Sequence, residues 1–435
     1  MGSLARPLLV VAMLAWGAVA HADFESALAA LDAKQYELAL REFRTLAKAG
    51  DARAMARLGS MYRNGHAVKV DYEQAMSWYR KADAAGEGRG AVGIGLLHEF
   101  GQGVAADPAE ALRWYRRAVA LKSPYGHYLL GRAYEKGVGV PRDAAKALEQ
   151  FRLAADGGEA DAINAVGFAY FHGEGVAKDH AEARGWFLRA AEAGDPSGQY
   201  YLALMLRDGD GGAQDRESAA AWMRRAATSG VTDAQVALGQ MCMKGWGVPR
   251  DVAQGLDWYR RAAKQDDPDA HMQLAAEFYR GRNVPRDPAQ AKVHARAAAD
   301  HGDPRAQVLL ATLLFQEAEE SATPDYTEAL AQARASAQQG NTDGEFLYGL
   351  YLFAGYGTER DPDAALPLFV SAAKKGHEGA KCMIDSGLAT DLYDRDDPTL
   401  SDYGDMLKAL DRANSPECRE WGLYAKIGFD ARIGK

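Results

Sequence analysis

A glycine that returns every 36 residues constrains the fold of this 435-residue chain more than any other feature. Lys122 and Asp266 fill the two points of the grid that lack it, and the glycines themselves are Gly50, Gly86, Gly158, Gly194, Gly230 and Gly302. A fixed period of this length is typical of arrays in which each unit packs on its neighbours. Because such arrays form extended surfaces more readily than enclosed catalytic pockets, the period favours a binding protein over an enzyme.

Nine units can be aligned between residues 51 and 376, and each holds two helical patterns separated by a glycine-rich turn. Two positions of the first helix, those of Ala54 and Gly59, are Gly or Ala in every unit, which predicts close helix packing. A glycine follows the first helix in eight units, as expected of a left-handed C-terminal cap. An aspartate then begins the second helix in all nine: Asp71, Asp107, Asp143, Asp179, Asp215, Asp251, Asp287, Asp325 and Asp361.

These motifs resemble the Sel-one-like repeat, a variant of the tetratricopeptide repeat. The unit at residues 87–122 carries the pattern most fully, with Gly-Gln-Gly-Val at its turn and Glu-Ala-Leu-Arg-Trp-Tyr-Arg-Arg-Ala in its second helix. The seventh and eighth units depart from it, since His294 and Gln332 replace the tryptophan of the second helix. The resemblance implies an all-α, right-handed solenoid of αα-hairpins whose first helices line a concave face. We expect capping helices at residues 23–50, the repeat array at 51–376 and a capping region at 377–435.

Residues 1–22 have the pattern of a secretory signal peptide. Arg6 precedes an apolar run from Leu8 to Val19, and Ala20-His21-Ala22 forms a small-x-small cleavage site. The apolar run is too short to span a bilayer as a helix. We therefore expect cleavage after Ala22, no membrane span in the mature chain and a periplasmic location, with secretion as the alternative.

Charge and composition disfavour several kinds of ligand. The full chain has a net charge of −9, and removal of residues 1–22, whose only charged side chain is Arg6, makes the mature chain still more acidic. An acidic protein is a poor match for nucleic acid. No two histidines stand at i,i+4 spacing and no His/Cys cluster has zinc spacing, so we expect neither metal nor cofactor. The export pattern would permit a disulfide between Cys382 and Cys418, whereas Cys242 falls on a core position.

Two motifs superficially suggest enzymes. Gly101-Gln-Gly103-Val resembles part of a dinucleotide fingerprint, but it follows a helix and recurs in nearly every unit. Ser371 and Lys374 match the Ser-x-x-Lys of penicillin-recognising enzymes, yet no Lys-Thr-Gly accompanies them. Some secreted members of the repeat family bind or slowly hydrolyse β-lactams, but they are rich in paired cysteines. A cell-wall or β-lactam-interacting enzyme is therefore the alternative, and we expect no catalytic residue.

A stripe of variable residues on the first helices is the candidate binding surface. It follows the register of Arg53, Ala56, Ser60 and Arg63, which points away from the small-residue seam. Aromatic side chains interleaved with charges suit a peptide or helix partner. The predicted contact residues are Phe100, Tyr125, Tyr128, Arg132, Phe168, Phe171, Tyr200, Arg207, Met243, Met272, Tyr279, Phe315, Phe346 and Phe353.

The sequence thus predicts an exported, non-catalytic scaffold that binds partner proteins on its concave face, and the family resemblance implies that these partners are envelope proteins. The resemblance implies roles in envelope assembly, polysaccharide export or signalling and does not choose among them. A secreted factor that binds host proteins is a further alternative. The oligomeric state is open.

Overall fold

Each unit of the repeat folds into two antiparallel helices joined by a short turn. The computed structural model describes residues 23–385, and every regular element in that range is an α-helix. The helices are α1 Phe24–Asp32, α2 Tyr36–Lys48, α3 Ala52–Asn64, α4 Tyr72–Ala84, α5 Gly88–Phe100, α6 Pro108–Ala120, α7 Pro124–Lys136, α8 Ala144–Asp156, α9 Ala160–His172, α10 His180–Glu192, α11 Pro196–Asp208, α12 Arg216–Thr228, α13 Thr232–Lys244, α14 Val252–Ala263, α15 Pro268–Arg280, α16 Pro288–Asp300, α17 Pro304–Glu319, α18 Thr327–Gln338, α19 Thr342–Ala354, α20 Pro362–Lys374 and α21 Glu378–Asp385.

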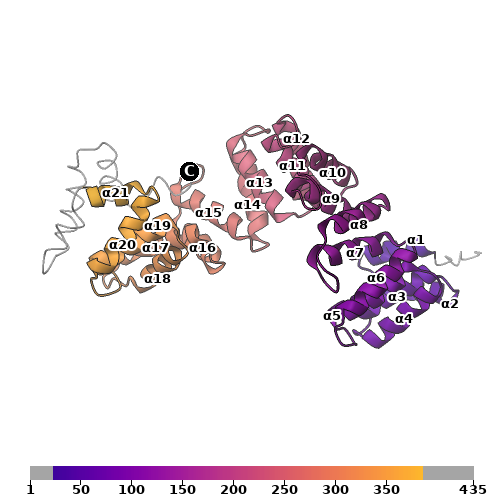
Figure 1. Ribbon diagram of the computed structural model, residues 1–435. Helices are drawn as coiled ribbons and strands as arrows, with labels where there is room; N and C mark the ends of the chain where they lie inside the picture. Colours follow the sequence, from indigo (N-terminus) through magenta and orange to yellow (C-terminus); the bar gives the residue numbers. More distant parts are fainter. Residues whose placement is uncertain (1–22, 386–435) are drawn as a thin grey trace, which may run out of the picture. The chain divides into compact units, whose positions relative to one another are not determined.

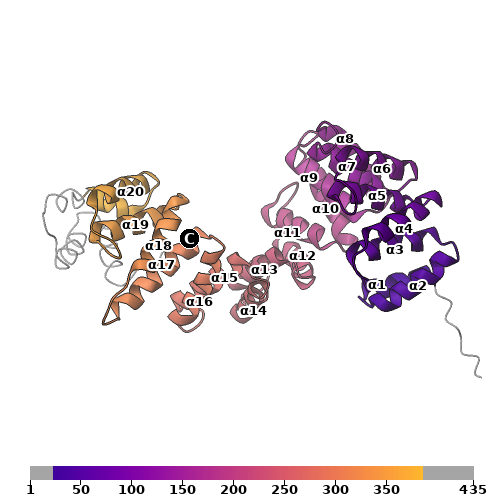
Figure 2. The ribbon, with the colours of Figure 1, turned by 90° about the horizontal axis from the view of Figure 1, so that it is seen from below.

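The helices are distributed over two compact units (Figures 1 and 2). The N-terminal unit runs to Gly198 and includes residues 210–212, and the C-terminal unit contains residues 199–209 and the chain from Ala213 onward. Consecutive helices pack against each other from α1 to α10 in the N-terminal unit and from α12 to α21 in the C-terminal unit. The fold is therefore an all-α solenoid of hairpins, as the period predicts.

Aspartate caps fix where the second helices begin. In eight of the nine hairpins the predicted aspartate is the N-cap residue, and its side chain accepts a hydrogen bond from a backbone N–H of the first turn. In the eighth hairpin the cap position is shifted. There Tyr326 is the N-cap, and Asp325 accepts a hydrogen bond from the Thr327 N–H at 2.9 Å. The prediction is thus confirmed for eight caps and is wrong by one residue for the ninth.

The glycine after the first helix sets the length of that helix. Seven first helices end at a glycine cap in the left-handed conformation, with φ between 64° and 78°, and each of these helices has 13 residues. The eighth unit has Glu317 at the equivalent position, and its first helix, α17, continues to Glu319 and reaches 16 residues. Without a residue that favours the left-handed conformation, the helix has no local signal to end there.

The small residues of the first helices serve two different contacts. At the Gly59 position, an added Cβ would lie 2.5–2.9 Å from the ring of an aromatic residue on the second helix of the same hairpin. At the Ala54 position, an added Cβ on Gly90 would lie 2.5 Å from the backbone nitrogen of Asp83 in the preceding hairpin. Only this second position is the backbone-to-backbone approach that the sequence predicts. The first is a slot for an aromatic side chain.

The amino-terminal hairpin covers the core of the first repeat. Phe24 and Ala27 of α1 and Phe43 of α2 pack against Ala54 and Leu58 of α3 in one buried cluster. Asp23 is the N-cap of α1, and its carboxylate accepts a hydrogen bond from the Ser26 N–H at 2.7 Å. Helix α21 packs on α20 at the other end of the described residues.

Candidate protein-binding surface

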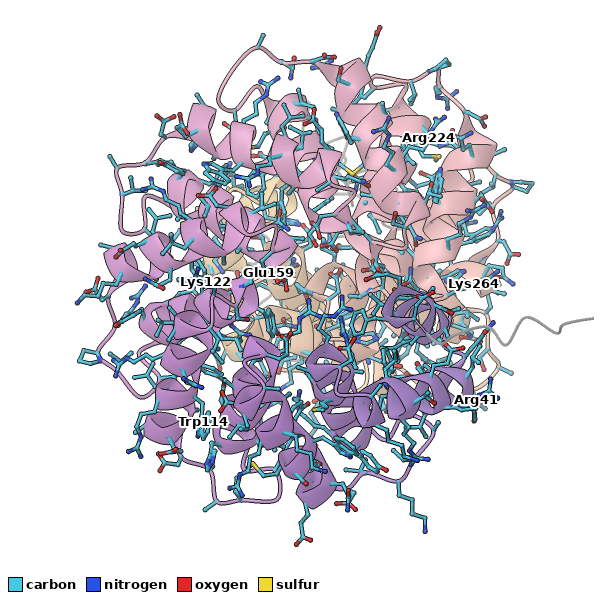
Figure 3. The ribbon with its side chains drawn as sticks, turned by 90° about the vertical axis from the view of Figure 1, so that its right-hand side faces the viewer. Arg41, Trp114, Lys122, Glu159, Arg224 and Lys264 are labelled. Atoms are coloured by element: carbon cyan, nitrogen blue, oxygen red, sulfur yellow. The ribbon has the colours of Figure 1, made fainter. Side chains whose placement is uncertain are left out.

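The first helices of neighbouring hairpins lie closer together than the second helices do. In the N-terminal unit α5 touches both α3 and α7, and in the C-terminal unit α17 touches both α15 and α19, while second helices of the described hairpins make no comparable contact with one another. The side formed by the first helices is therefore the tighter, inner side of each unit, and we call it the inner face. In Figure 3, Trp114 of a second helix lies toward the outside of the N-terminal unit and Glu159, just before α9, lies nearer its middle.

The predicted contact residues differ widely in their exposure. Phe100 is exposed, with 57% of its surface accessible. A second group is half-buried: Tyr125, Tyr128, Arg132, Phe168, Phe171, Tyr200, Arg207 and Phe315. A third group is buried, each with less than a tenth of its surface accessible: Met243, Met272, Tyr279, Phe346 and Phe353.

The five buried residues belong to the core and are not part of an accessible surface. Phe346 and Phe353 both pack on Phe369 of α20, with ring centroids 5.8 and 6.3 Å from its ring. Met272 and Tyr279 lie in the cluster that joins α15 to α16 and α17, and Met243 packs on α14. Helical register alone places them on the variable stripe, but in the structure they pack against the helices that follow, α14, α16, α17 and α20. For these five, the expected place in the binding surface is corrected.

The half-buried aromatic residues rest on neighbouring rings. Tyr128 stacks on Tyr125 one turn earlier in α7 at 5.7 Å, and it also touches Phe151 of α8 at 5.8 Å. Phe168 meets Phe187 edge to face at 5.1 Å, and Phe171 stacks on His180 at 4.7 Å. A ring that is held on one side and partly open on the other is pre-organised to receive a partner side chain.

Acidic groups surround the tyrosines of the inner face. Burial raises the pKa of Tyr125, and the nearby carboxylates of Glu159 and Asp161 raise it further. Burial likewise raises the pKa of Tyr200, with Asp233 as the next cause. These hydroxyl groups therefore stay protonated at neutral pH and can donate hydrogen bonds.

The two predicted arginines have different surroundings. Arg207 forms an ion pair with its neighbour Asp208, at 2.7 Å between Nη2 and Oδ2. Arg132 instead lies over the ring of Tyr128, with its guanidinium carbon 5.9 Å from the ring centroid. A cation over an aromatic ring keeps its edge N–H groups available for a further partner.

The stripe predicted from the sequence leaves out two polar residues of the inner face. Arg57 of α3 is half-buried, and its Nε atom is buried without a hydrogen-bond partner. Asn164 of α9 is buried and donates a hydrogen bond to Asp195 at 2.7 Å, while its Oδ1 atom has no partner. The sequence does mark Arg57 as unusual, because the equivalent position holds Gly93 and Leu129 in the next two repeats. A charged residue at a repeat position that is otherwise small or apolar breaks the local sequence pattern, and such breaks are typical of functional sites.

The structure also places the remaining candidate residues from the sequence, namely the Ser-x-x-Lys motif and two of the cysteines. Ser371 and Lys374 lie in the last turn of α20. Within residues 23–385, no group of three or more His, Cys, Asp and Glu side chains could hold a metal ion, and no helix has the length and apolar content to cross a membrane. Cys242 is a buried free thiol. Cys382 is buried, whereas Cys418 lies outside the described residues, so the bridge between them stays a prediction, as does the signal peptide at 1–22.

Comparison with known families decides the identity of the repeat. The Sel1 repeat model matches residues 52–86, 89–123, 124–159, 160–195, 196–231, 232–267, 268–303 and 342–377, which together are more than half of the chain. The chain belongs to the Sel1 repeat family. The stretch between the last two matches is the eighth hairpin of this Sel1 repeat protein, α17 and α18, where the glycine cap is missing and the aspartate cap is shifted.

Solved structures with the same repeat are similar to this Sel1 repeat protein. A protective antigen of uropathogenic Escherichia coli strains, which displays the Sel1-like repeat fold, is 29% identical, covers 90% of this chain and 82% of its own, and superposes with a TM-score of 0.68. A Sel1 repeat protein from Oxalobacter formigenes is 27% identical over 55% of this chain and 95% of its own, with a TM-score of 0.46. A comparison with curated proteins gives no match. Sel1 repeat proteins are generally scaffolds for protein interactions.

Proposed function

We propose that this protein is an exported, non-catalytic scaffold that holds partner proteins on its inner face. The observation that carries the proposal is that one set of repeat positions builds the fold and a different set lies on the inner face. Residues that recur in every unit make caps and close helix contacts, whereas residues on the inner face vary between units. Positions that do not serve the fold are free to serve recognition.

The half-buried aromatic residues of the N-terminal unit are the centre of the proposed contact. Tyr128 and Phe171 are each supported by a neighbouring ring, and Phe100 projects from the end of α5. Aromatic side chains with one supported face contribute strongly to protein interfaces, because they bury a large area with little loss of side-chain entropy. A peptide or a helix of a partner protein fits such a surface.

Export is the second part of the proposal and rests on the signal-peptide pattern of residues 1–22. The similar protein from Escherichia coli is described as a protective antigen, which agrees with an exported protein. Fractionation of cells that express the full chain distinguishes the locations. Protein in the periplasm supports an envelope scaffold, protein only in the medium supports a secreted factor that binds host proteins, and protein only in the cytoplasm contradicts export.

In-cell crosslinking followed by mass spectrometry of the captured proteins tests the binding surface. Tyr128→Ala and Phe171→Ala are expected to lose partners that the unaltered chain captures. Leu153→Ala is the matched control, because Leu153 is an exposed apolar residue on the second helix α8 of the same unit. If both aromatic variants fold and keep every partner, the inner face is not the binding surface.

A further inference from the structure

Most arginines on the inner face of the N-terminal unit pair with no carboxylate; Arg53 of α3 is the exception, because it pairs with Asp51 at 3.3 Å and with Glu25 at 3.8 Å. In the C-terminal unit, Arg207 pairs with Asp208, and Arg305 pairs with Asp303 and Asp269 at 2.6 and 2.5 Å. In the N-terminal unit, helices α3, α5 and α7 carry four arginines for which no carboxylate of the described residues lies within 4.0 Å: Arg57, Arg63, Arg89 and Arg132. We call these four residues the arginine cluster.

Arg57 shows most clearly that the chain's own carboxylates do not neutralise this cluster. Its Nε atom is buried and has no hydrogen-bond partner. Burial lowers the pKa of Arg57, and the like charge of Arg89 on the next first helix lowers it further, while Asp32 and Glu87 act in the opposite direction. Removing a guanidinium from water costs free energy that a hydrogen-bonded anion would offset.

Three of the four arginines act on shared tyrosines and Arg89 acts on Arg57, which places the cluster around one region of the inner face. The positive charges of Arg63 and Arg57 both oppose the burial that raises the pKa of Tyr79 to about 12. The charges of Arg132 and Arg63 both oppose the rise in the pKa of Tyr125. Arg63 also donates a hydrogen bond from Nε to Gln102 at 2.8 Å, which holds it against the turn after α5.

Acidic side chains also lie near the cluster, and two of them are engaged in hydrogen bonds of their own. Glu87 accepts a hydrogen bond from the backbone N–H of Arg89 as the cap of α5, and Glu99 accepts one from the hydroxyl of Tyr115. Glu159 and Asp161 lie at the start of α9, where burial first and then the charge of Asp161 raise the pKa of Glu159, while the charge of Arg89 opposes that rise without an ion pair within 4.0 Å. The inner face of this unit is therefore basic along α3, α5 and α7 and acidic at α9.

We propose that the inner face of the N-terminal unit binds an acidic peptide segment of a partner protein through Arg57, Arg63, Arg89 and Arg132. Guanidinium groups form two parallel hydrogen bonds with a carboxylate, and Tyr125 and Tyr128 flank the cluster with rings for the intervening residues. A short acidic segment needs to meet only the arginine cluster, whereas nucleic acid is charged along its whole length and would also meet the rest of the chain, whose net charge is −9. The proposal rests on the proposed function, which it deepens by naming the chemistry of the partner.

Selection from a random peptide library on the purified mature chain tests the proposal. Peptides rich in Asp and Glu are expected from the unaltered chain, and the enrichment should disappear with Arg57→Gln and, separately, with Arg89→Gln. Arg89 is exposed, so its variant keeps the test valid if loss of Arg57 disturbs folding. Arg116→Gln is the matched control, since Arg116 is exposed on the second helix α6 of the same unit and should leave the enrichment unchanged.

A selected peptide then supplies a quantitative measure. Fluorescence anisotropy should show that replacing its Asp and Glu by Asn and Gln weakens binding at least about tenfold, and that Arg89→Gln does the same. Binding should also weaken as the salt concentration rises. Absence of acidic enrichment, or binding that is indifferent to Arg57 and Arg89, overturns the proposal, and so does an arginine-dependent preference for a DNA oligonucleotide over acidic peptides.

The two proposals fail in different ways. If partners captured in cells are lost with Tyr128→Ala but kept with Arg57→Gln and Arg89→Gln, the inner face binds proteins and the acidic-peptide proposal is wrong. If both sets of variants keep every partner, the scaffold proposal itself is wrong.

Discussion

At the scale of single residues, glycine and aromatic side chains are matched within each hairpin. The Gly59 position holds glycine in the six hairpins whose second helix carries an aromatic residue opposite: Gly59 with Tyr79, Gly95 with Tyr115, Gly131 with Phe151, Gly167 with Phe187, Gly239 with Tyr259 and Gly349 with Phe369. It holds alanine in the other three, where the second helix has Met223, Ala295 or Ala333. The ring occupies the volume that a Cβ would need, so the two positions must change together.

This matching predicts the outcome of Gly131→Ala. The new Cβ would lie 2.7 Å from two ring carbons of Phe151, and we expect a loss of about 1–2 kcal/mol in the free energy of unfolding despite the better helix propensity of alanine. The double variant with Phe151→Met has the alanine–methionine pair that the fifth hairpin uses, and it should recover part of that loss. Urea denaturation of the single and double variants measures the coupling. Gly185→Ala is the control: it has no atom within 4 Å of a built Cβ and should stabilise the protein.

A second residue-scale prediction concerns the two points of the 36-residue grid that lack glycine. Lys122 and Asp266 adopt left-handed φ values of 57° and 61°, where a side chain is strained. Lys122→Gly should therefore stabilise the protein by up to about 1 kcal/mol, after allowing for the greater flexibility of glycine in the unfolded chain. The shift of the urea midpoint measures it. Lys136→Gly, in the last turn of α7, should destabilise instead, and equal effects of the two changes would contradict the explanation.

At the scale of elements, the seventh hairpin contains a pair of histidines that join its two helices. His271 of α15 and His294 of α16 lie 2.9 Å apart between their Nδ1 atoms, and Phe278 stacks on His294. Burial lowers the pKa of His294, followed by the charges of His271 and of Arg260 on α14. Asp266 lies 3.9 Å from the Nε2 of His271 and also pairs with His301. Two protonated imidazoles at this distance would repel each other.

This pair predicts that the C-terminal unit loses stability in acid. A histidine whose pKa is lower in the folded state binds fewer protons there than when unfolded, so its contribution is present above the ordinary pKa of about 6.5 and is lost as the pH falls through it. His294→Gln should reduce this loss, because the third hairpin already uses His127 and Gln150 in the same way, with Nδ1 and Oε1 at 2.9 Å. Thermal unfolding at pH 7 and pH 5 tests it; equal pH dependence in the variant would contradict this role.

At the scale of the whole molecule, hairpins contact their sequence neighbours, so a local defect should spread only a short way. Phe187 of α10 and Phe369 of α20 are both fully buried, and either change to Ala should cost about 3–5 kcal/mol locally. Hydrogen exchange should show lost protection in α9 and α10 for Phe187→Ala and in α19 and α20 for Phe369→Ala. Uniform loss of protection along the chain in either variant would contradict the view that each hairpin depends mainly on its sequence neighbours.

The repeat length, the helix pairs and most of the helix ends can be predicted from the sequence. These follow from contacts between residues close in the chain, such as the Asp107 carboxylate with the backbone N–H groups of Ala109 and Glu110, so the register reveals them. Which of the variable residues are accessible depends on how the helices pack in three dimensions. Phe346 and Phe171 stand on the same helical stripe, yet Phe346 is buried against α20 and Phe171 is only half-buried. The angle between packed helices and the volume of neighbouring side chains control that exposure, and helical periodicity contains neither.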